Sequence, residues 1–337
     1  MDLFSYNTKF VILTKPFKIE NMNFIKSLFG IKESKENNKE TDNNKNFDIL
    51  KYDGIRALNI QKIAYAIRCL EGALEIKNDV ETMELLANAY IADNNNKGAI
   101  AVLERECAFS PNEIKPLLSL ASVLFLEEDY IKMNEVCNKA IELDDNDASA
   151  LYLNAKALVG LNDDIMAIAM LTKAISLKED YIEARLLRAT TLNSMKQIND
   201  AKEDLDRVLS IDADNEAALL LFGEILASEN NIEEAISILD NVLSINPFNE
   251  KAYIIKGNML AENNDFDRAI EMYDEAIEIN PNFAKAFHER GRIKLIKGDK
   301  EGSIEDMKKA MEIAPENESK IDGQFKNYDS ITKNVPW

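Results

Sequence analysis

The chain has 337 residues, of which 46% are hydrophobic and 30% are charged, with only 11 Gly and 7 Pro. This composition is typical of a helix-rich globular protein. The formal net charge of −20 excludes nucleic acid as a natural partner, since phosphate binding needs a basic face. The three cysteines, Cys69, Cys107 and Cys137, lie far apart and form neither a zinc motif nor a disulfide framework, so we expect a cytoplasmic location.

Residues 1–32 are predicted to be an N-terminal arm, whose apolar run at residues 10–13 is too short to cross a bilayer. Within this arm, residues 22–31 (MNFIKSLFGI) form a short amphipathic helix in our prediction. That helix can cover the open end of the first folded unit, contact a membrane or dock on a partner, and the sequence leaves the three alternatives open. Residues 33–46 contain no apolar residue and are predicted to be a disordered polar linker.

From residue 47 onward the sequence repeats with a period of 34 residues, as the spacing of Pro247, Pro281 and Pro315 shows. A small residue takes the eighth position of every unit, and only the first interval, of 33 residues, departs from the period. These residues are Gly54, Ala87, Ala121, Ala155, Ala189, Gly223, Gly257 and Gly291. A second small residue, or a near substitute such as Met133, follows 12 positions later, and a large apolar residue follows after four more.

Turn-forming residues lie midway through the units, for example Asn162-Asp163 and Asn230-Asn231. This pattern resembles the tetratricopeptide repeat, in which two antiparallel helices approach closely where both carry small side chains. The resemblance covers residues 47–317 and implies an all-α fold, a right-handed α-solenoid (superhelix) of eight helical hairpins. The predicted units are 47–79, 80–113, 114–147, 148–181, 182–215, 216–249, 250–283 and 284–317.

Residues 318–337 are predicted to be a capping helix and tail, because a solenoid exposes the apolar face of its last hairpin. Ile321, Phe325 and Tyr328 continue the helical phase of the preceding units. An alternative is that the last residues, which end at the single tryptophan Trp337, form a docking motif.

The sequence carries no recognisable catalytic set, cofactor site or metal site. His288 is the only histidine, and no cysteine lies within one helical turn of it. Acidic clusters at residues 144–147 and 212–216 lack the glycine and the twelfth-position glutamate of a calcium loop and fall where helix caps are expected. No glycine-rich phosphate loop is present. We therefore predict a protein that is not an enzyme and needs no cofactor.

In the family that the chain resembles, positions two, five, six, nine, twelve and thirteen of the first helix line a concave groove that binds peptides. Transferring these positions gives thirteen candidate groove residues: Leu118, Tyr152, Leu153, Leu186, Leu187, Leu220, Leu221, Lys251, Ile254, Asn258, Lys285, His288 and Arg292. The aliphatic members favour a peptide with large apolar anchors. The alternative is that one residue of each pair at positions five and six packs between neighbouring hairpins.

The polar members lie in the last two units. Family members that hold the C-terminal carboxylate of chaperones use a fixed set of Lys, Asn and Arg. Lys251, Asn258 and Lys285 occupy some of those position types, but Ile254 and Glu289 stand where other members of the set belong. The sequence does not have the complete set.

The leading hypothesis is a scaffold that binds a peptide or protein segment in this groove. The alternative is a regulatory or substrate-targeting subunit of an enzyme on another chain, possibly tethered to a membrane through residues 22–31. The sequence does not identify the partner.

Overall fold

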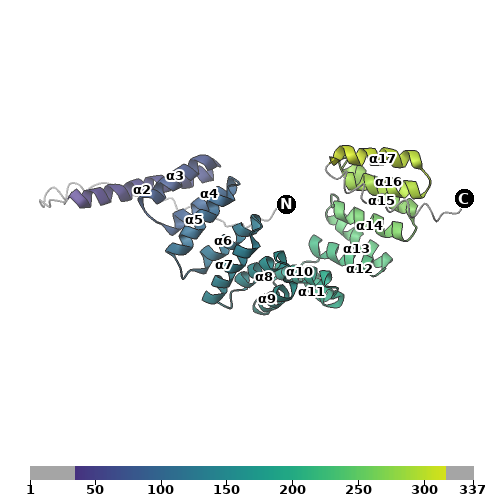
Figure 1. Cartoon of the computed structure of the whole chain (residues 1–337), viewed down its shortest axis with the longest axis horizontal. Helices are drawn as coiled ribbons and strands as arrows, with labels where there is room; N and C mark the ends of the chain where they lie inside the picture. The colour runs from purple at the N-terminus through teal and green to yellow at the C-terminus, as the bar shows by residue number, and fades with distance from the viewer. Residues whose placement is uncertain (1–34, 316–337) are drawn as a thin grey trace. The chain divides into compact units, whose positions relative to one another are not determined.

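A computed structural model describes residues 35–315 of the chain, and the side chains from residue 42 onward. This part is entirely helical and consists of 16 helices, which pair in chain order into eight hairpins (Figure 1). Below, helix A is the first helix of a hairpin and helix B is the second. The all-α repeat fold is therefore confirmed. The predicted N-terminal arm, its residues 22–31 and the predicted capping helix with Trp337 lie outside the described residues.

In chain order, the A helices are α2 Lys35–Asn59, α4 Val80–Ala92, α6 Ile114–Leu126, α8 Ala148–Gly160, α10 Ile182–Ser194, α12 Glu216–Ser228, α14 Glu250–Glu262 and α16 Ala284–Ile296. The B helices are α3 Ile63–Ile76, α5 Asn96–Phe109, α7 Tyr130–Leu143, α9 Asp164–Leu177, α11 Ile198–Ile211, α13 Ile232–Ile245, α15 Phe266–Ile279 and α17 Lys300–Ile313.

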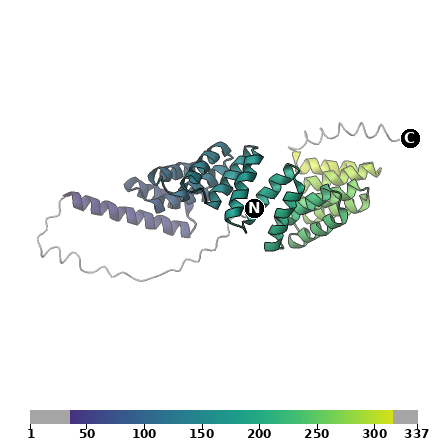
Figure 2. The ribbon, with the colours of Figure 1, turned by 90° about the horizontal axis from the view of Figure 1, so that it is seen from below.

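The chain divides into two compact units, residues 1–102 and residues 103–337, and the division falls within α5. In the first unit, α2 and α3 pack against each other, and both contact α4 (Figure 1). Figure 2 shows the length of α2, the purple helix at the start of the coloured ribbon. Lys51 of α2 forms ion pairs with Asp79, 2.7 Å away, and with Glu81, 2.5 Å away. These pairs fasten α2 to the beginning of α4.

Helix α2 departs from the predicted disordered linker, because residues 35–46 are helical. The side chains of residues 42–46 are all exposed, and Phe47 is the first buried residue among the side chains of α2 that the structure describes. A polar sequence can extend a helix that is already nucleated by a packed segment, since each added residue then forms a backbone hydrogen bond without a new nucleation cost. The prediction of a disordered linker was therefore wrong for residues 35–46, whose backbone is helical. The side chains of residues 42–46 nevertheless add nothing to the core.

Every helix A ends at a residue in the left-handed backbone region. These residues are Gln61, Asn94, Glu128, Asn162, Lys196, Asn230, Asn264 and Gly298. At the end of α8, the N–H of Asn162 donates to the carbonyl of Val159 and that of Asp163 to the carbonyl of Leu158, the arrangement of a Schellman motif. The carboxylate of Asp163 then accepts from the N–H of Met166 and caps α9. One short turn thus ends helix A and begins helix B.

The acidic clusters at the turns between hairpins contain helix caps, as predicted. Asp147 accepts a hydrogen bond from the N–H of Ala150 and begins α8. Asn215 accepts from the N–H of Ala218 and begins α12. Among the described residues, no group of His, Cys, Asp or Glu is arranged to hold a metal ion.

The small residues of the repeat allow the two helices of a hairpin to approach closely. A Cβ atom added at Gly257 would lie 2.5 Å from the ring of Tyr273, and one added at Gly223 would lie 2.8 Å from Leu239. Both Tyr273 and Leu239 are the large apolar residues that the period placed 16 positions after the glycine, and both are fully buried. The large residue of helix B therefore packs directly on the small residue of helix A.

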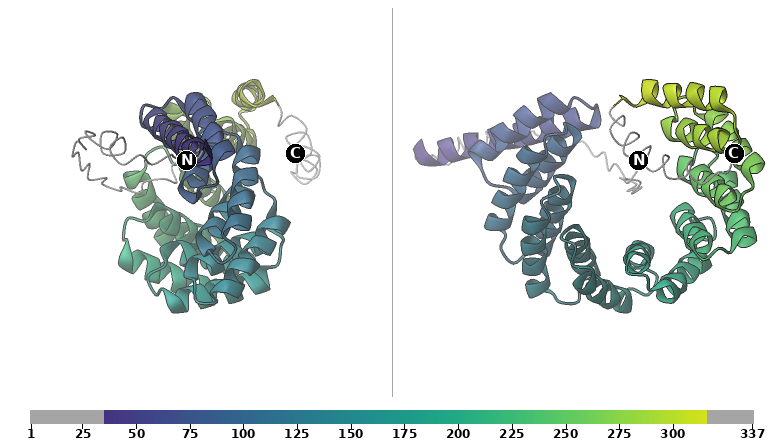
Figure 3. Two further views of the ribbon diagram at one scale, coloured as in Figure 1. Left: turned by 90° about the vertical axis from the view of Figure 1, so that its left-hand side faces the viewer. Right: turned by 45° about the vertical axis from the view of Figure 1, so that its right-hand side comes forward.

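In residues 103–315, each helix A contacts the helix A of the next hairpin, and each helix B contacts the helix A that follows it (Figures 1 and 3). No comparable contact joins consecutive B helices of this unit. We call the row formed by α6, α8, α10, α12, α14 and α16 the A layer. Its helices form one continuous surface, on which the predicted binding residues lie.

Candidate functional site

The structure places all thirteen predicted groove residues on helices of the A layer. Nine are half-buried, and Lys251 and Lys285 are exposed. The remaining two, Leu221 and Ile254, are core residues that leave only 8% and 6% of their surface exposed. Leu221 packs with Leu192 and Ile225, and Ile254 packs with Tyr253 and Phe283. These two side chains hold hairpins together and are not free to contact a partner.

The other apolar candidates are partly accessible. Leu186 and Leu187 pack on different core clusters, one on each side of α10, and both keep some surface open to solvent. Tyr152 and Leu220 also pack on a core cluster while half-buried. Together with Leu118 and Leu153, they give the A layer a row of half-buried apolar side chains from α6 to α12. Thr190 and Ala217, at two further predicted groove positions, are exposed within that row.

The polar candidates are largely engaged within the protein. Lys251 forms an ion pair with Glu224, 2.6 Å away, and the side chain of Asn258 accepts a hydrogen bond of 2.8 Å from Tyr273. Arg292 lies 3.1 Å from Glu289, and His288 lies 3.3 Å from the same carboxylate. Of the four predicted cations, the structure leaves Lys285 without an ion pair among the described residues.

Burial raises the pKa of the Glu289 carboxylate, but the hydrogen bond with His288 and the charge of Arg292 outweigh burial and lower the pKa below its usual value. Glu289 is therefore ionised at neutral pH. The contact that the structure gives His288 is with this carboxylate, which agrees with a structural role.

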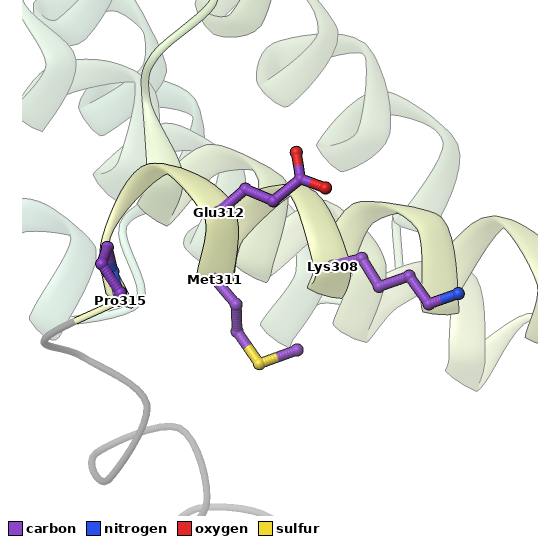
Figure 4. A pocket seen from close by; sticks show the side chains of 4 residues that line it. All are labelled: Lys308, Met311, Glu312 and Pro315. Atoms are coloured by element: carbon purple, nitrogen blue, oxygen red, sulfur yellow. The ribbon is translucent and has the colours of Figure 1, made fainter.

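Two pockets lie elsewhere on the second unit, and none of the thirteen predicted residues lines either of them. One, of about 330 Å³, is lined by Lys308, Met311, Glu312 and Pro315 at the end of α17 (Figure 4). The other, of about 180 Å³, lies beside the turns that precede α14 and α16 and is lined in part by Phe248, Tyr253 and Phe283. No helix of residues 35–315 is long and apolar enough to span a membrane.

Comparison with protein families agrees with the period and the hairpins. The model of the tetratricopeptide repeat protein 21 C-terminal ARM domain matches residues 144–287, and a model of the tetratricopeptide repeat matches residues 284–317. The chain is a tetratricopeptide repeat protein. No curated protein matches the sequence.

Solved structures share the fold. A tetratricopeptide repeat protein from Parabacteroides merdae is 17% identical over 73% of this chain and 97% of its own, with a TM-score of 0.60. Yeast Tom70 is 17% identical over 86% of this chain and 65% of its own, with a TM-score of 0.56. The APC/C hetero-tetramer Cut9-Hcn1 contains a chain that is 15% identical over 79% of this chain and 52% of its own, with a TM-score of 0.56. At these identities the likeness shows the fold alone.

This tetratricopeptide repeat protein also carries buried ion pairs that the sequence analysis missed. Arg188 of α10 forms two hydrogen bonds with Asp204 of α11, and Arg185 forms a third with the same carboxylate. Arg290 of α16 binds Asp306 of α17 in the same two-pronged manner, and it also binds Asp274 of the preceding hairpin. The spacing of 16 residues between Arg and Asp, repeated in two units, is the signal that could have revealed them.

A second feature missed from the sequence is Lys156 of α8. Its Nζ atom lies 3.5 Å from the ring centroid of Phe125 in α6 and 5.8 Å from that of Tyr152. Lys156 stands at the ninth position of its helix, one of the groove positions of the family, and is half-buried. Tetratricopeptide repeat proteins present such positions on the A layer, so this cation belongs to the candidate site.

Proposed function

We propose that this protein is an interaction scaffold whose A layer, over residues 103–315, binds a peptide segment of a partner protein. The repeat fold is that of protein-interaction scaffolds, which supports the general role. The observation that carries the proposal is the continuous row of A helices, which bear half-buried apolar side chains from Leu118 to Leu220. Apolar side chains left partly open along a continuous surface gain free energy when a partner covers them.

The chemistry of this row favours a peptide with several large aliphatic or aromatic side chains. Each such side chain contributes about 1.5 to 3 kcal/mol when it is fully buried, so that several shallow contacts together give useful affinity. A rigid surface built from helices also binds with little reorganisation of its own. A short peptide is a better match than a second folded surface, because a line of apolar side chains along successive A helices suits an extended or helical segment.

The proposal is tested by adding charge to the row without disturbing the core. Thr190→Glu and Ala217→Glu together place two carboxylates at exposed positions of α10 and α12, beside Leu186 and Leu220. We expect the double variant to bind a partner peptide at least about 10-fold more weakly, because apolar anchors would then lie against ionised groups. Partners captured from native lysate by the wild-type protein supply the peptide, whose affinity is then measured by calorimetry.

Ser210→Glu is a matched control, because Ser210 is an exposed residue of the B helix α11. It adds the same charge away from the A layer, and its capture and affinity should equal those of the wild type. Unchanged binding by the double variant, with folding verified by circular dichroism, contradicts the proposal. Capture of a catalytic polypeptide would favour the alternative role as a regulatory or targeting subunit of an enzyme.

A further inference from the structure

Lys156 differs from the other buried and half-buried cations of the A layer in having no carboxylate partner. Arg188, Lys256 and Arg290 each bind an aspartate of a neighbouring B helix. Lys156 forms no ion pair with any residue of the part of the chain that the structure describes, and burial lowers the pKa of its ammonium group. A charge that is withdrawn from water without a counterion is unfavourable unless something else compensates it.

Aromatic rings provide only part of that compensation. The ammonium group lies over the Phe125 ring at 3.5 Å, a favourable cation–π geometry. Tyr152 packs against Tyr181 at a centroid distance of 5.2 Å, and Phe125 packs against Tyr130 at 6.1 Å. The rings are thereby fixed by their neighbours. The ammonium group has three N–H donors, and a ring face covers only one side of it. The N–H donors that point away from the ring are left without a hydrogen-bond acceptor from it.

The surroundings of Lys156 are apolar and partly open. Phe125 and Tyr152, the two rings beside Lys156, are half-buried, as is Leu153 one helical turn before it in α8. Leu126, next to Phe125 in the sequence of α6, exposes 56% of its surface. Glu183 contributes to raising the pKa of both Tyr152 and Tyr181, whereas burial is what lowers the pKa of Lys156. The site thus offers one positive charge between apolar side chains.

We propose that Lys156 binds the side-chain carboxylate of an Asp or Glu in the partner peptide, and that an apolar side chain of the peptide packs beside it on Phe125 and Leu126. This assignment rests on the proposed function of the A layer and specifies one feature of its partner. An amino-acid carboxylate is favoured over a nucleic-acid phosphate, since a chain of net charge −20 repels a polyanion but tolerates a single acidic residue. A charge-assisted hydrogen bond at a half-buried site is also strong enough to select among peptides.

The test is selection from a random peptide library displayed on phage. The peptides are fused at the amino terminus of the coat protein, so that none has a free C-terminal carboxylate. The wild-type protein should select peptides with Asp or Glu next to a large apolar residue. Lys156→Met should keep the apolar preference and lose the acidic one, with affinity for wild-type-selected peptides reduced about 10- to 100-fold. Lys156→Glu should select Lys or Arg at the same place, and Lys156→Arg should keep the acidic preference.

Lys178→Met is the matched control. Lys178 also lies over an aromatic ring, that of Tyr181 at 4.1 Å, but it is exposed at the end of α9. Its replacement should leave the selected sequences unchanged. Circular dichroism establishes that each variant is folded, and Lys156→Gln replaces Lys156→Met if the latter is not.

The outcomes separate the two proposals. An acidic preference that persists in folded Lys156→Met, or wild-type selection of apolar peptides without any acidic residue, overturns the role of Lys156 and leaves the A layer as the binding surface. Failure of the wild type to select any peptide overturns both proposals. Equal selection by the wild type and by the Thr190→Glu, Ala217→Glu variant, together with an unchanged acidic preference in Lys156→Met, overturns the proposed function. Equal selection by that double variant with loss of the acidic preference in Lys156→Met instead confines the binding surface to the hairpins around α8.

Discussion

Hairpins α6–α9 and α10–α17 follow the same repeat, yet polar contacts between their helices differ in chemistry. In α8 the seventh position of helix A is Asn154, whose buried amide donates to the side chains of Asn134 and Asn138. In α10, α14 and α16 that position is a cation, Arg188, Lys256 or Arg290, bound to an aspartate. At the seventh position of helix A, the first pair of hairpins thus uses neutral amides, and most of the second group uses charge pairs. Lys156 lies in the first pair and has no counterion among the described residues.

The two groups of hairpins in the second unit also differ in how much apolar surface they expose. Ile131 and Ile165, at equivalent positions of α7 and α9, expose 67% and 71% of their surfaces. The later hairpins carry Asn199, Glu233, Asp267 and Glu301 at this position. Hairpins α6–α9 therefore present more apolar surface together with an unpaired cation. Hairpins α10–α17 instead use their charges to join neighbouring helices.

Replacing one member of a buried ion pair should have the largest effect on stability. Asp204 is almost fully buried and is bound by both Arg185 and Arg188. Asp204→Ala leaves two cations without their carboxylate and should lower the free energy of unfolding by about 3 kcal/mol. Asn154→Ala should cost only about 1 kcal/mol, because Asn134 and Asn138 can bind water instead.

Urea unfolding measures both changes, and hydrogen exchange identifies which hairpins loosen, since repeat arrays unfold locally. Asp240→Ala is the control: Asp240 pairs with Lys256 but is half exposed, so its loss should cost less than that of Asp204. Equal losses for Asp204→Ala and Asn154→Ala would remove the distinction between the two groups of hairpins.

Lowering the pH should have a smaller effect on stability, and this effect should appear in the hairpins that contain charge pairs. Burial raises the pKa of Asp306, but hydrogen bonds from Arg290 and Lys294 outweigh it and hold the pKa below the usual value of 3.8. A carboxylate whose pKa is lower in the folded state than in the unfolded state stabilises the fold above the unfolded pKa, and this contribution is lost as the pH falls toward the folded pKa. Hairpin α16–α17 should therefore weaken below about pH 4, whereas the Asn154 contacts do not titrate.

Hydrogen exchange at pH 7 and pH 3 measures this loss for each hairpin. Asp306→Asn should flatten the pH dependence of α16–α17, because a neutral side chain stands where the carboxylate was. A wild-type pH profile that Asp306→Asn leaves unchanged would mean that other carboxylates dominate the acid response.

Much of the fold could be predicted from the sequence, because the determinants of the hairpin are local and repeat. Gly257 and Tyr273 are 16 residues apart and pack on each other, as the period indicated. The phase of the repeat also placed all thirteen candidate residues on A helices. The helical start of α2 at residues 35–46 was missed because composition does not reveal whether a polar segment continues an established helix.

The accessibility of individual site residues could not be predicted in the same way. Leu220 and Leu221 share positions five and six with Ile254 and Ile255, yet the buried residue is the second of one pair and the first of the other. Which side chain is covered depends on how the next hairpin packs, a property that the period does not contain. Lys156 was missed for a similar reason, since its partner Phe125 belongs to the preceding hairpin.

The binding role of the A layer is tested most directly by methyl NMR of the protein titrated with a captured peptide. Peptide binding should shift the methyl signals of Leu118, Leu153 and Leu186 on the A helices. The signals of Leu177 and Ile211, exposed at the ends of the B helices α9 and α11, should stay unchanged. Shifts confined to the B helices, or saturable binding with no shift on the A layer, would contradict the account.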